Sequence, residues 1–264
     1  MKIAVCIKQV PDTSEVELDP ETNTLVRTGL PSIINPDDKS GIEAALALKA
    51  MAGEGSSVTV VSMGPPQAEM ALLEALAMGC DEAFLVSDRK FGGSDTLATS
   101  TILAASLKKI GYDLIVTGRQ AIDGDTAQVG PQIAEHLGIP QVSYVQEVEL
   151  EDGAIIALRQ FEDRYHKVRV KLPCLLTAIT ELSKPRYMTV GGVIDAEKKP
   201  IHHLDFEALG DLLDPAAIGL KGSPTNVVKS YTKEQKSAGA LLKGLTVDAA
   251  VNAIMATLKE NHIV

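Results

Sequence analysis

Tryptophan is absent from this 264-residue chain, and other aromatic residues and cysteines are few. Sparse aromatic residues argue against a stacking surface for single-stranded nucleic acid. The three cysteines, Cys6, Cys80 and Cys174, are odd in number, far apart and surrounded by apolar neighbours. This pattern predicts small core residues in a reducing compartment, and it excludes a disulfide framework or a cysteine metal site.

The chain also lacks an excess of basic residues and lacks long apolar runs. Its net charge is −10, with acidic and basic residues well mixed, so nothing indicates a nucleic-acid-binding surface. No apolar run is long enough to span a bilayer, and the apolar segment at 3–7 is too short for a secretory signal. We therefore expect a cytoplasmic protein without a membrane span, and 45% hydrophobic residues suffice for a large core.

Short apolar runs alternate with amphipathic segments through the first half of the chain. The predicted strands are 2–8, 58–62, 83–87 and 112–117, and the predicted helices are 39–52, 67–78, 96–110 and 129–137. Asn35, Asp37 and Asp38 are candidate caps of the first helix. This alternation predicts an α/β fold with a doubly wound, mostly parallel, Rossmann-like sheet.

Beyond Gly138 the period changes to two. Segments 141–150, 155–161 and 166–171 predict an antiparallel extension, and 175–180 predicts a strand that returns to the main sheet. The remaining predictions are a hairpin formed by 16–18 and 24–27, an exposed loop at 182–200, a short helix at 204–213, a polar arm at 219–239 and a helix at 245–261 capped by Thr246. We expect a nucleotide-binding domain over 1–220 and a C-terminal arm and helix over 221–264.

The most distinctive stretch is GRQAIDGDTAQVGP at 118–131, between a predicted strand and a predicted helix. In a doubly wound sheet such a loop lies at the carboxyl ends of the strands, where ligands bind, and the N–H groups of the next helix favour an anion such as phosphate. Thr126 is placed to cap that helix. Asp123 and Asp125 would repel a phosphate unless their side chains point elsewhere. An ordinary strand–helix turn with capping acids is the alternative.

The loops expected at this edge of the sheet carry no catalytic constellation. The five histidines lie outside them, and no His, Cys or Asp cluster has zinc-ligand spacing. There is no Walker-type lysine loop and no properly placed GxGxxG. Small residues, hydroxyls, amides and helix N-termini remain, which can hold a nucleotide and leave the chemistry to it. We expect no catalytic residue and no metal.

Several motifs together resemble a known family. VCIKQVPD at 5–12, INPDD at 34–38, VSMGPP at 61–66, the 118–131 stretch, KLPCLLT at 171–177 and KPRYMTV at 184–190 are similar to the β subunit of electron-transfer flavoprotein, in its order and spacing. KQVPDT at 8–13 and FGGSDTLATS at 91–100 resemble its electron-bifurcating branch. That branch implies a second FAD in this subunit, where the simpler branch holds AMP.

The resemblance implies a set of nucleotide contacts. They fall on Cys6, Asn35, Pro36, Asp37, Asp38, Met63, Gly118, Arg119, Gln120, Ala121, Ile122, Asp123, Gly124, Asp125, Thr126, Ala127, Gln128 and Val129. The amides of 123–129 would cradle phosphate, and Asn35 would border the ribose or adenine. Cys6 and Met63 would form an apolar wall, with plain core packing as the alternative. Asp95, Thr96 and Thr99 would face the isoalloxazine ring, beside glycines that let it approach the backbone.

The resemblance also implies partners. Tyr187, Met188 and Val190 match a loop that docks on a flavin-dependent dehydrogenase, and a solvated surface loop is the alternative. The C-terminal arm would embrace an α subunit carrying its own FAD. NADH would donate a hydride to the FAD of this subunit, whose electrons would divide between ferredoxin or flavodoxin and the dehydrogenase.

Other functions remain open at this stage. One is the non-bifurcating carrier with structural AMP. Another is an adenylating enzyme, because FGGSDT faintly resembles the SGGxDS pyrophosphate loop, although it follows the third strand here. A nucleotide-binding regulator of the stress-protein type is a further alternative.

Overall fold

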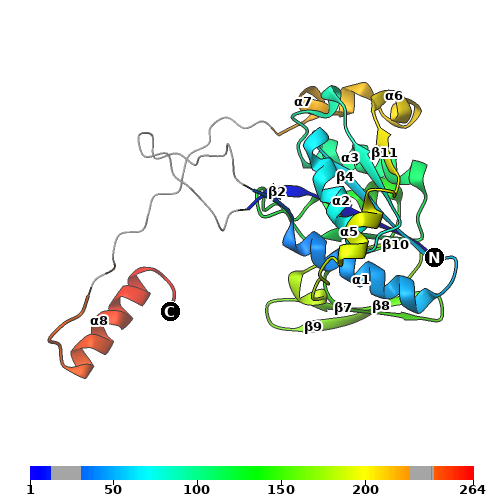
Figure 1. Cartoon of the computed structure of the whole chain (residues 1–264). Coiled ribbons are helices and arrows are strands. Elements are labelled where there is room, and N and C mark those ends of the chain that lie inside the picture. The colour runs from blue at the N-terminus through cyan, green and yellow to red at the C-terminus, as the bar shows by residue number, and fades with distance from the viewer. Residues whose placement is uncertain (13–30, 226–238, 240) are drawn as a thin grey trace. The chain divides into compact units, whose positions relative to one another are not determined.

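The computed structural model describes residues 1–12, 31–225, 239 and 241–264 (Figure 1). The chain divides into two compact units, Met1–Val228 and Lys229–Val264, and each is described by itself. The hairpin predicted within 16–27 lies outside the described residues.

A nine-stranded sheet forms the centre of the first unit, in the order β11-β5-β4-β1-β6-β10-β7-β8-β9. Its strands are β1 (Lys2–Ile7), β4 (Ser57–Met63), β5 (Glu82–Val86), β6 (Leu114–Gly118), β7 (Gln141–Glu151), β8 (Ala154–Gln160), β9 (Tyr165–Lys171), β10 (Cys174–Ala178) and β11 (Ile201–Leu204). All neighbours from β11 to β7 are parallel, and β7, β8 and β9 are antiparallel. The predicted α/β class, the parallel sheet and its antiparallel extension are confirmed.

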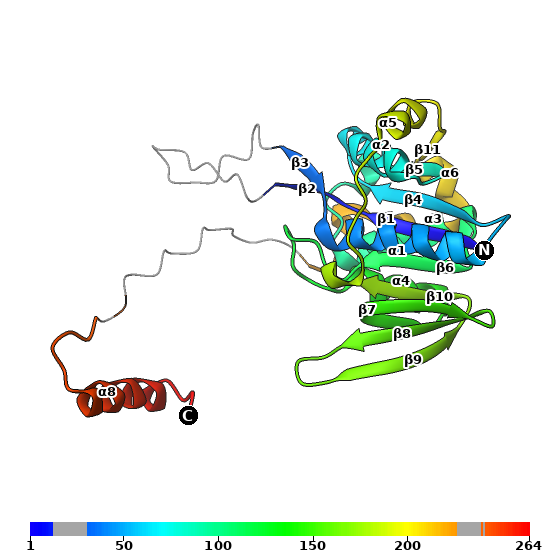
Figure 2. The same cartoon turned by 60° about the horizontal axis from the view of Figure 1, so that its bottom comes forward.

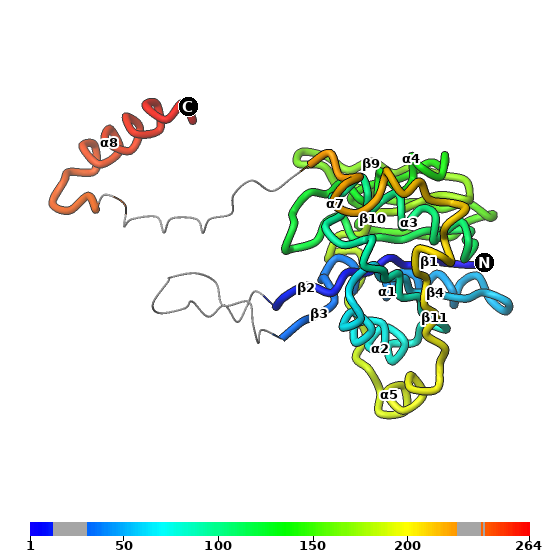
Figure 3. The backbone as a smooth tube through the Cα atoms, turned by 90° about the horizontal axis from the view of Figure 1, so that it is seen from above, coloured from blue at the N-terminus to red at the C-terminus, as the bar shows by residue number. Residues whose placement is uncertain are grey.

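Helices cover both faces of this sheet (Figure 3). The helices are α1 (Pro36–Ala52), α2 (Glu69–Met78), α3 (Thr96–Ile110), α4 (Val129–Leu137), α5 (Val190–Ala196), α6 (Phe206–Leu209), α7 (Gly219–Gly222) and, in the second unit, α8 (Val247–Glu260). One core holds residues of α1 and α2, and the other holds residues of α3 and α4. A small sheet of β2 (Gln9–Pro11) and β3 (Ser32–Ile34) lies beside the main one.

Strand β1 shows why the sheet is covered on both sides. Its residues Ile3, Val5 and Ile7 belong to the α1–α2 core, and the alternate residues Ala4 and Cys6 belong to the α3–α4 core. Because successive side chains of a strand point to opposite faces, a continuous apolar run requires two covering layers. Helix α1 lies over β1 and β6 (Figure 2).

The direction of chain progression reverses at β1. The chain passes from β1 to β4 and β5 on one side, and then returns to place β6 on the other side of β1. Such a reversal opens a crevice at the carboxyl ends of the two strands, where ligands of doubly wound folds bind.

Most predicted elements agree with the structure to within a few residues. Helix α1 begins three residues earlier than predicted, at Pro36, because proline suits the first helical position. The prediction that 182–200 is wholly a loop is wrong, because it contains α5, and the short parallel strand β11 follows it. A Cβ at Gly192 of α5 would lie 2.5 Å from the carbonyl oxygen of Ala77. The glycines that weaken the helical pattern therefore permit close packing against α2.

The second unit contains α8, whose predicted cap is confirmed. The Thr246 hydroxyl oxygen accepts a hydrogen bond from the Ala249 N–H at 3.3 Å. No helix in the described parts of the chain combines the length and apolar character needed to cross a bilayer.

Candidate functional site

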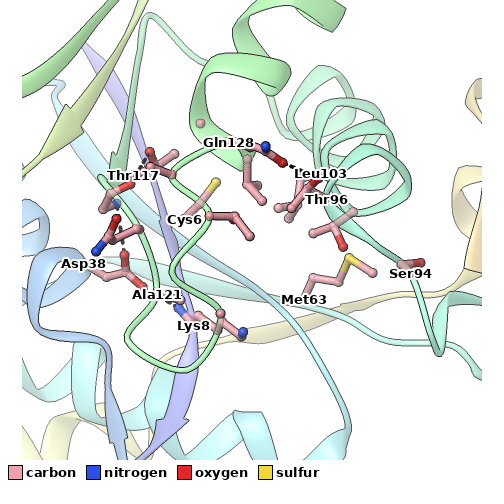
Figure 4. Close-up of a pocket in the computed structure, with 18 of the residues that line it drawn as sticks. Cys6, Lys8, Asp38, Met63, Ser94, Thr96, Leu103, Thr117, Ala121 and Gln128 are labelled. Carbon is pink, nitrogen blue, oxygen red and sulfur yellow. Dashed lines mark hydrogen bonds between the residues drawn. The ribbon is translucent and has the colours of Figure 1, made fainter. Parts of the chain in front are cut away.

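A cavity of about 420 Å³ lies at the carboxyl edge of the parallel sheet. Residues at the ends of β1 and β4 line it, together with residues of the loops that follow β5 and β6. In Figure 4, Asp38 and Thr117 lie on one side, Ser94 and Thr96 on the other, and Cys6 between them. The volume is in the range of small-molecule sites.

The structure brings most of the predicted contact residues to this cavity. Those that line it are Cys6, Asp38, Met63, Asp95, Thr96, Thr99, Gly118, Arg119, Gln120, Ala121, Gly124, Asp125, Thr126, Ala127, Gln128 and Val129. Asn35, Pro36, Asp37, Ile122 and Asp123 are not among the lining residues.

Asn35 is fully buried behind the β6–α4 loop, which comprises residues 119–128. Its Oδ1 accepts from the Ile122 N–H at 3.1 Å, and its Nδ2 donates to the Gln120 carbonyl at 2.8 Å. Asn35 occupies the position before α1 but makes no side-chain cap bond to that helix, so its predicted capping role is wrong. The side chain instead holds the loop that follows β6.

Asp38 joins the ends of the two central strands. Its Oδ2 accepts from the Lys8 N–H at 2.7 Å, and its Oδ1 accepts from the Gly118 N–H at 3.0 Å and from Asn35 Nδ2 at 3.1 Å. Burial raises the pKa of this carboxyl to about 7, against the opposite effect of these three donors. One buried carboxyl group thus connects β1, β6 and α1.

The two acids that were expected to repel a phosphate have partners within the site. The Lys8 Nζ contacts both carboxylate oxygens of Asp123, at 2.7 and 2.8 Å. The Asp125 Oδ1 accepts from Gln120 Nε2. Both negative charges are therefore engaged, and Lys8 bridges the end of β1 to the β6–α4 loop.

The β6–α4 loop has an unusual backbone. Asp125 and Ala127 have φ values of 53° and 52°, which non-glycine residues seldom adopt. Gln128, next to Ala127, has right-handed angles of −108° and −33°. A left-handed residue followed by a right-handed one, as at Ala127 and Gln128, forms a backbone concavity whose successive N–H groups can bind an anion.

Helix α4 begins at this concavity. Its N-cap is Gln128, so the prediction that Thr126 caps it is wrong, and no side chain bonds its first N–H groups. The Gln128 side chain instead accepts from the Thr96 hydroxyl at 2.9 Å, which joins α4 to α3. The first N–H groups of α4 remain available to a ligand.

Helix α3 meets the cavity with a capped N-terminus. Asp95 Oδ1 accepts from the Ala98 N–H at 3.0 Å, and Asp95 Oδ2 accepts from the Thr225 N–H at 2.9 Å. Asp95 therefore stabilises its own helix and fixes the segment after α7. Thr96, the first residue of α3, and Thr99, about one turn later, also line the cavity, and the Thr96 hydroxyl donates to Gln128 Oε1.

The glycines before α3 serve packing within the chain. A Cβ at Gly93 would lie 3.0 Å from the Cβ of Leu220 in α7, and Gly93 has a φ of 76°. The Ser94 hydroxyl donates to the Phe91 carbonyl and accepts from the Gly219 N–H. The space at Gly93 that was expected to admit a bulky ring is thus occupied by α7. Ser94, the serine of FGGSDT, stabilises the contact with α7.

Cys6 and Met63 lie on the floor of the cavity. Burial, with a smaller contribution from the Asp38 charge, raises the pKa of the Cys6 thiol to about 12. The thiol is therefore neutral at physiological pH. Since only a thiolate is an effective nucleophile, Cys6 acts as a small apolar surface.

Sequence reasoning missed several lining residues. They are Ile7, Lys8, Phe91, Ser94, Leu103, Thr117 and Gly130. A signal existed for Lys8, which ends a predicted buried strand. A signal existed for Gly130 as well, since a Cβ there would lie 2.6 Å from Thr117 Oγ1, so glycine allows α4 to sit close to the sheet.

The arrangement can bind an anionic nucleotide. Within the described residues, no group of three or more His, Cys, Asp and Glu side chains could hold a metal ion. The cavity combines an apolar floor, threonine hydroxyls and converging backbone N–H groups, which are the elements of a cofactor site.

A second feature lies away from the cavity, on the segment around α5. Tyr187 is 92% exposed, and Met188 and Val190 are also exposed. Arg186 forms a bidentate ion pair with Glu43 of α1, with both N–O distances 2.8 Å. Lys199 donates to the carbonyl oxygens of Leu76 and Cys80 at the end of α2. An exposed apolar tip is therefore held between two anchored ends.

The basic residues around the tip are Lys184, Arg186, Lys198 and Lys199, and free basic residues there could guide a partner electrostatically. Arg186 and Lys199 have intramolecular partners, and Lys198 pairs with Asp195 at 3.0 Å. Three of the four basic residues around the tip therefore stabilise the segment itself.

The junction at Gly118 generates a first prediction. A Cβ at Gly118 would lie 2.1 Å from Asp38 Oδ1 and 3.0 Å from the Asp38 backbone nitrogen. Gly118→Ala should therefore lower the free energy of unfolding by about 1–3 kcal/mol, measured by denaturant unfolding. Gly124→Ala, in the same loop with no atom within 4 Å of its Cβ, should change it by less than about 0.5 kcal/mol. Equal effects would contradict the assigned contact.

The buried carboxyl of Asp38 generates a second prediction. Its pKa is 3.8 ordinarily and about 7 in the folded chain, so between these values the folded state keeps a proton that the unfolded state loses. This group's contribution to stability is complete below pH 3.8 and is lost as the pH rises to about 7. The difference in unfolding free energy between wild type and Asp38→Asn should decline across this window. Parallel pH profiles would contradict the buried, protonatable carboxyl.

Comparison with known proteins agrees with the motifs. The model of the electron transfer flavoprotein domain matches residues 22–209. The chain is 54% identical over 264 residues to the electron transfer flavoprotein subunit beta of Clostridium acetobutylicum. It is 52% identical to the caffeyl-CoA reductase-Etf complex subunit CarD of Acetobacterium woodii and 49% identical to the acryloyl-CoA reductase electron transfer subunit gamma of Anaerotignum propionicum. Each alignment covers the whole of both chains.

The match includes β3, the β6–α4 loop and α6, and the predicted resemblance is confirmed. The chain belongs to the electron transfer flavoprotein family.

Proposed function

We propose that this chain is the β subunit of a heterodimeric, electron-bifurcating electron transfer flavoprotein and that its cavity holds FAD. The observation that carries the proposal is the β6–α4 loop, where two left-handed residues and the uncapped start of α4 converge on a cavity at the strand reversal. The similarity to a subunit of the caffeyl-CoA reductase-Etf complex supports the assembly. The bifurcating assignment rests on KQVPDT and FGGSDTLATS, whose residues Lys8, Ser94 and Thr96 line the same cavity.

The residues present suit an adenine dinucleotide. The Gly124 and Asp125 N–H groups already bond the Ala121 carbonyl, so the backbone N–H groups of residues 126–129 would bind phosphate. The neutral Cys6 thiol and Met63 would contact an apolar ring. Thr96 and Thr99, at the start of α3, would hydrogen-bond a polar edge of the flavin. Lys8 neutralises Asp123 beside the phosphate position, so the acid does not oppose an anionic ligand.

When bound, FAD would supply two-electron acceptance from NADH and one-electron delivery to two acceptors. The acceptors would be ferredoxin or flavodoxin and the FAD of an α subunit, through which a flavin-dependent dehydrogenase is served. The protein residues would position the cofactor and exclude water, and none would exchange protons or electrons itself.

The exposed tip at Tyr187, Met188 and Val190 would dock on the dehydrogenase. An apolar surface whose two ends are fixed by Glu43 and by the last carbonyls of α2 loses little conformational freedom on binding. The 221–264 segment would contact the α subunit through the exposed apolar residues of α8, among them Val251 and Ile254.

The nucleotide content tests the proposal. The purified complex of this chain with its α subunit should release two FAD molecules per heterodimer on denaturation, and NADH should bleach the flavin absorbance. One FAD with one AMP per heterodimer, and no reduction by NADH, would replace this proposal with the non-bifurcating carrier. Release of pyrophosphate from ATP by the chain would favour the adenylating alternative.

Docking yields a separate prediction. Met188→Ala and Val190→Ala should slow electron transfer to the dehydrogenase on the order of tenfold, because interface anchors of this kind carry most of the binding energy. Flavin content and reduction by NADH should not change. Met51→Ala, an exposed methionine at the end of α1, is the matched control and should transfer electrons normally. Equal loss of flavin reduction and transfer in the Met188 and Val190 variants would contradict the assigned surface.

A further inference from the structure

We infer that Asn35 is a positioning residue that never contacts the nucleotide and instead acts as a template for the β6–α4 loop, with Asp38 as its support. The inference rests on the proposed function, because it identifies what gives the phosphate-binding loop its shape. It also differs from the expectation that Asn35 borders the ribose or adenine.

The first observation is where the polar atoms of Asn35 are used. The side chain is 0% exposed, and Asn35 is not among the cavity-lining residues. Its Oδ1 and Nδ2 pair with the Ile122 N–H and the Gln120 carbonyl, which are two residues apart on one edge of the loop. A side-chain amide can satisfy a backbone donor and a backbone acceptor together, as a neighbouring strand would.

The second observation is that Asn35 is itself fixed in orientation. Its Nδ2 also donates to Asp38 Oδ1, and its backbone N–H donates to the Lys8 carbonyl at 2.9 Å. Asp38 in turn accepts from the Lys8 and Gly118 N–H groups. The ends of β1 and β6 thereby orient the Asn35 amide, so the β6–α4 loop is fixed in position relative to the sheet.

The third observation is that the loop needs such support. Asp125 and Ala127 hold left-handed angles, which persist only where the surroundings impose them. Within the loop, the Gly124 and Asp125 N–H groups both bond the Ala121 carbonyl, between the two residues that Asn35 holds. Three other side-chain ties of the loop, Lys8–Asp123, Gln120–Asp125 and Thr96–Gln128, are exposed, and exposed pairs contribute little.

Ser40 provides a matched control on the same helix. It is as buried as Asn35, and its hydroxyl donates to the Ile179 carbonyl and accepts from the Ser183 N–H, each at 3.0 Å. Ser40→Ala therefore removes two buried hydrogen bonds of α1, but none that reaches the β6–α4 loop. It separates a general loss of stability from a loss of loop shape.

The test compares Asn35→Ala and Ser40→Ala in the full chain co-expressed with the α subunit. In nucleotide-free protein, hydrogen exchange at the Ile122, Gly124 and Asp125 amides should rise on the order of tenfold in Asn35→Ala and stay unchanged in Ser40→Ala. In loaded protein, the dissociation rate of the bound nucleotide should rise by a similar factor in Asn35→Ala alone. Unchanged loop exchange, or faster exchange with unchanged nucleotide retention, would overturn the inference.

If Asn35→Ala does not fold, the Asn35→Asp variant provides a second test of the template role. In Asn35→Asp, a protonated carboxyl could still accept from Ile122 and donate to Gln120, whereas the ionised form would repel Asp38 and the Gln120 carbonyl. The other ionisable groups nearby are Asp37, Arg119, Cys6 and Lys8. Loop protection and nucleotide retention, each measured relative to wild type at the same pH, should both recover as the pH is lowered. Deficits relative to wild type that stay constant with pH would overturn the template role.

The two readouts separate this inference from the proposed function. If the wild-type complex releases no nucleotide but the loop exchange still depends on Asn35, the loop template stands and the nucleotide assignment fails. If nucleotide is present and its retention does not depend on Asn35, the template inference fails and the nucleotide assignment stands.

Discussion

The site depends on one buried carboxyl group. Asp38 accepts hydrogen bonds from the N–H groups that end β1 and β6, and from the Asn35 amide at the start of α1. A carboxyl group removed from water is stable only when such donors surround it, so the sheet reversal, the helix start and the following loop are fixed together. Gly118 has no side chain because the Asp38 carboxylate occupies that space. Because these donors surround Asp38, this acidic residue can lie beside a site for an anionic ligand.

From this junction the cavity follows in three steps. The strand reversal opens a crevice, Asn35 and Asp38 hold the β6–α4 loop at its edge, and the left-handed residues of that loop turn N–H groups inward beside the uncapped start of α4. Helix α1 also carries Ser40 and Glu43, which hold the segment leading to the exposed tip at Tyr187. One helix therefore supports both the proposed cofactor site and the proposed docking surface, through different residues.

The sequence predicts the fold well, because the fold depends on local patterns, and most of the residues that it singles out as contacts line one cavity. Continuous apolar runs such as that of β1, and glycines that end helices such as Gly138, identify the strands, the helices and the edge where ligands bind. The roles of single side chains depend on long-range contacts and could not be predicted. Asn35 was expected to cap α1 and Thr126 to cap α4, yet Asn35 bonds residues 85 and 87 positions away and Gln128 starts α4. Helix α5 was missed because its glycines serve a contact with Ala77 that no local pattern records.

The central claim is that this subunit is a holder for an adenine-containing redox cofactor, with the chemistry supplied by that cofactor. Relatives of nearly equal length are named as subunits of electron transfer assemblies, which agrees with a holder of a redox cofactor. A crystal structure of the intact complex tests this most directly. The account predicts density for an adenine nucleotide whose phosphate lies within hydrogen-bond distance of the N–H groups of residues 126–129. A cavity beside Gly118 that is closed by side chains and contains no nucleotide would contradict it.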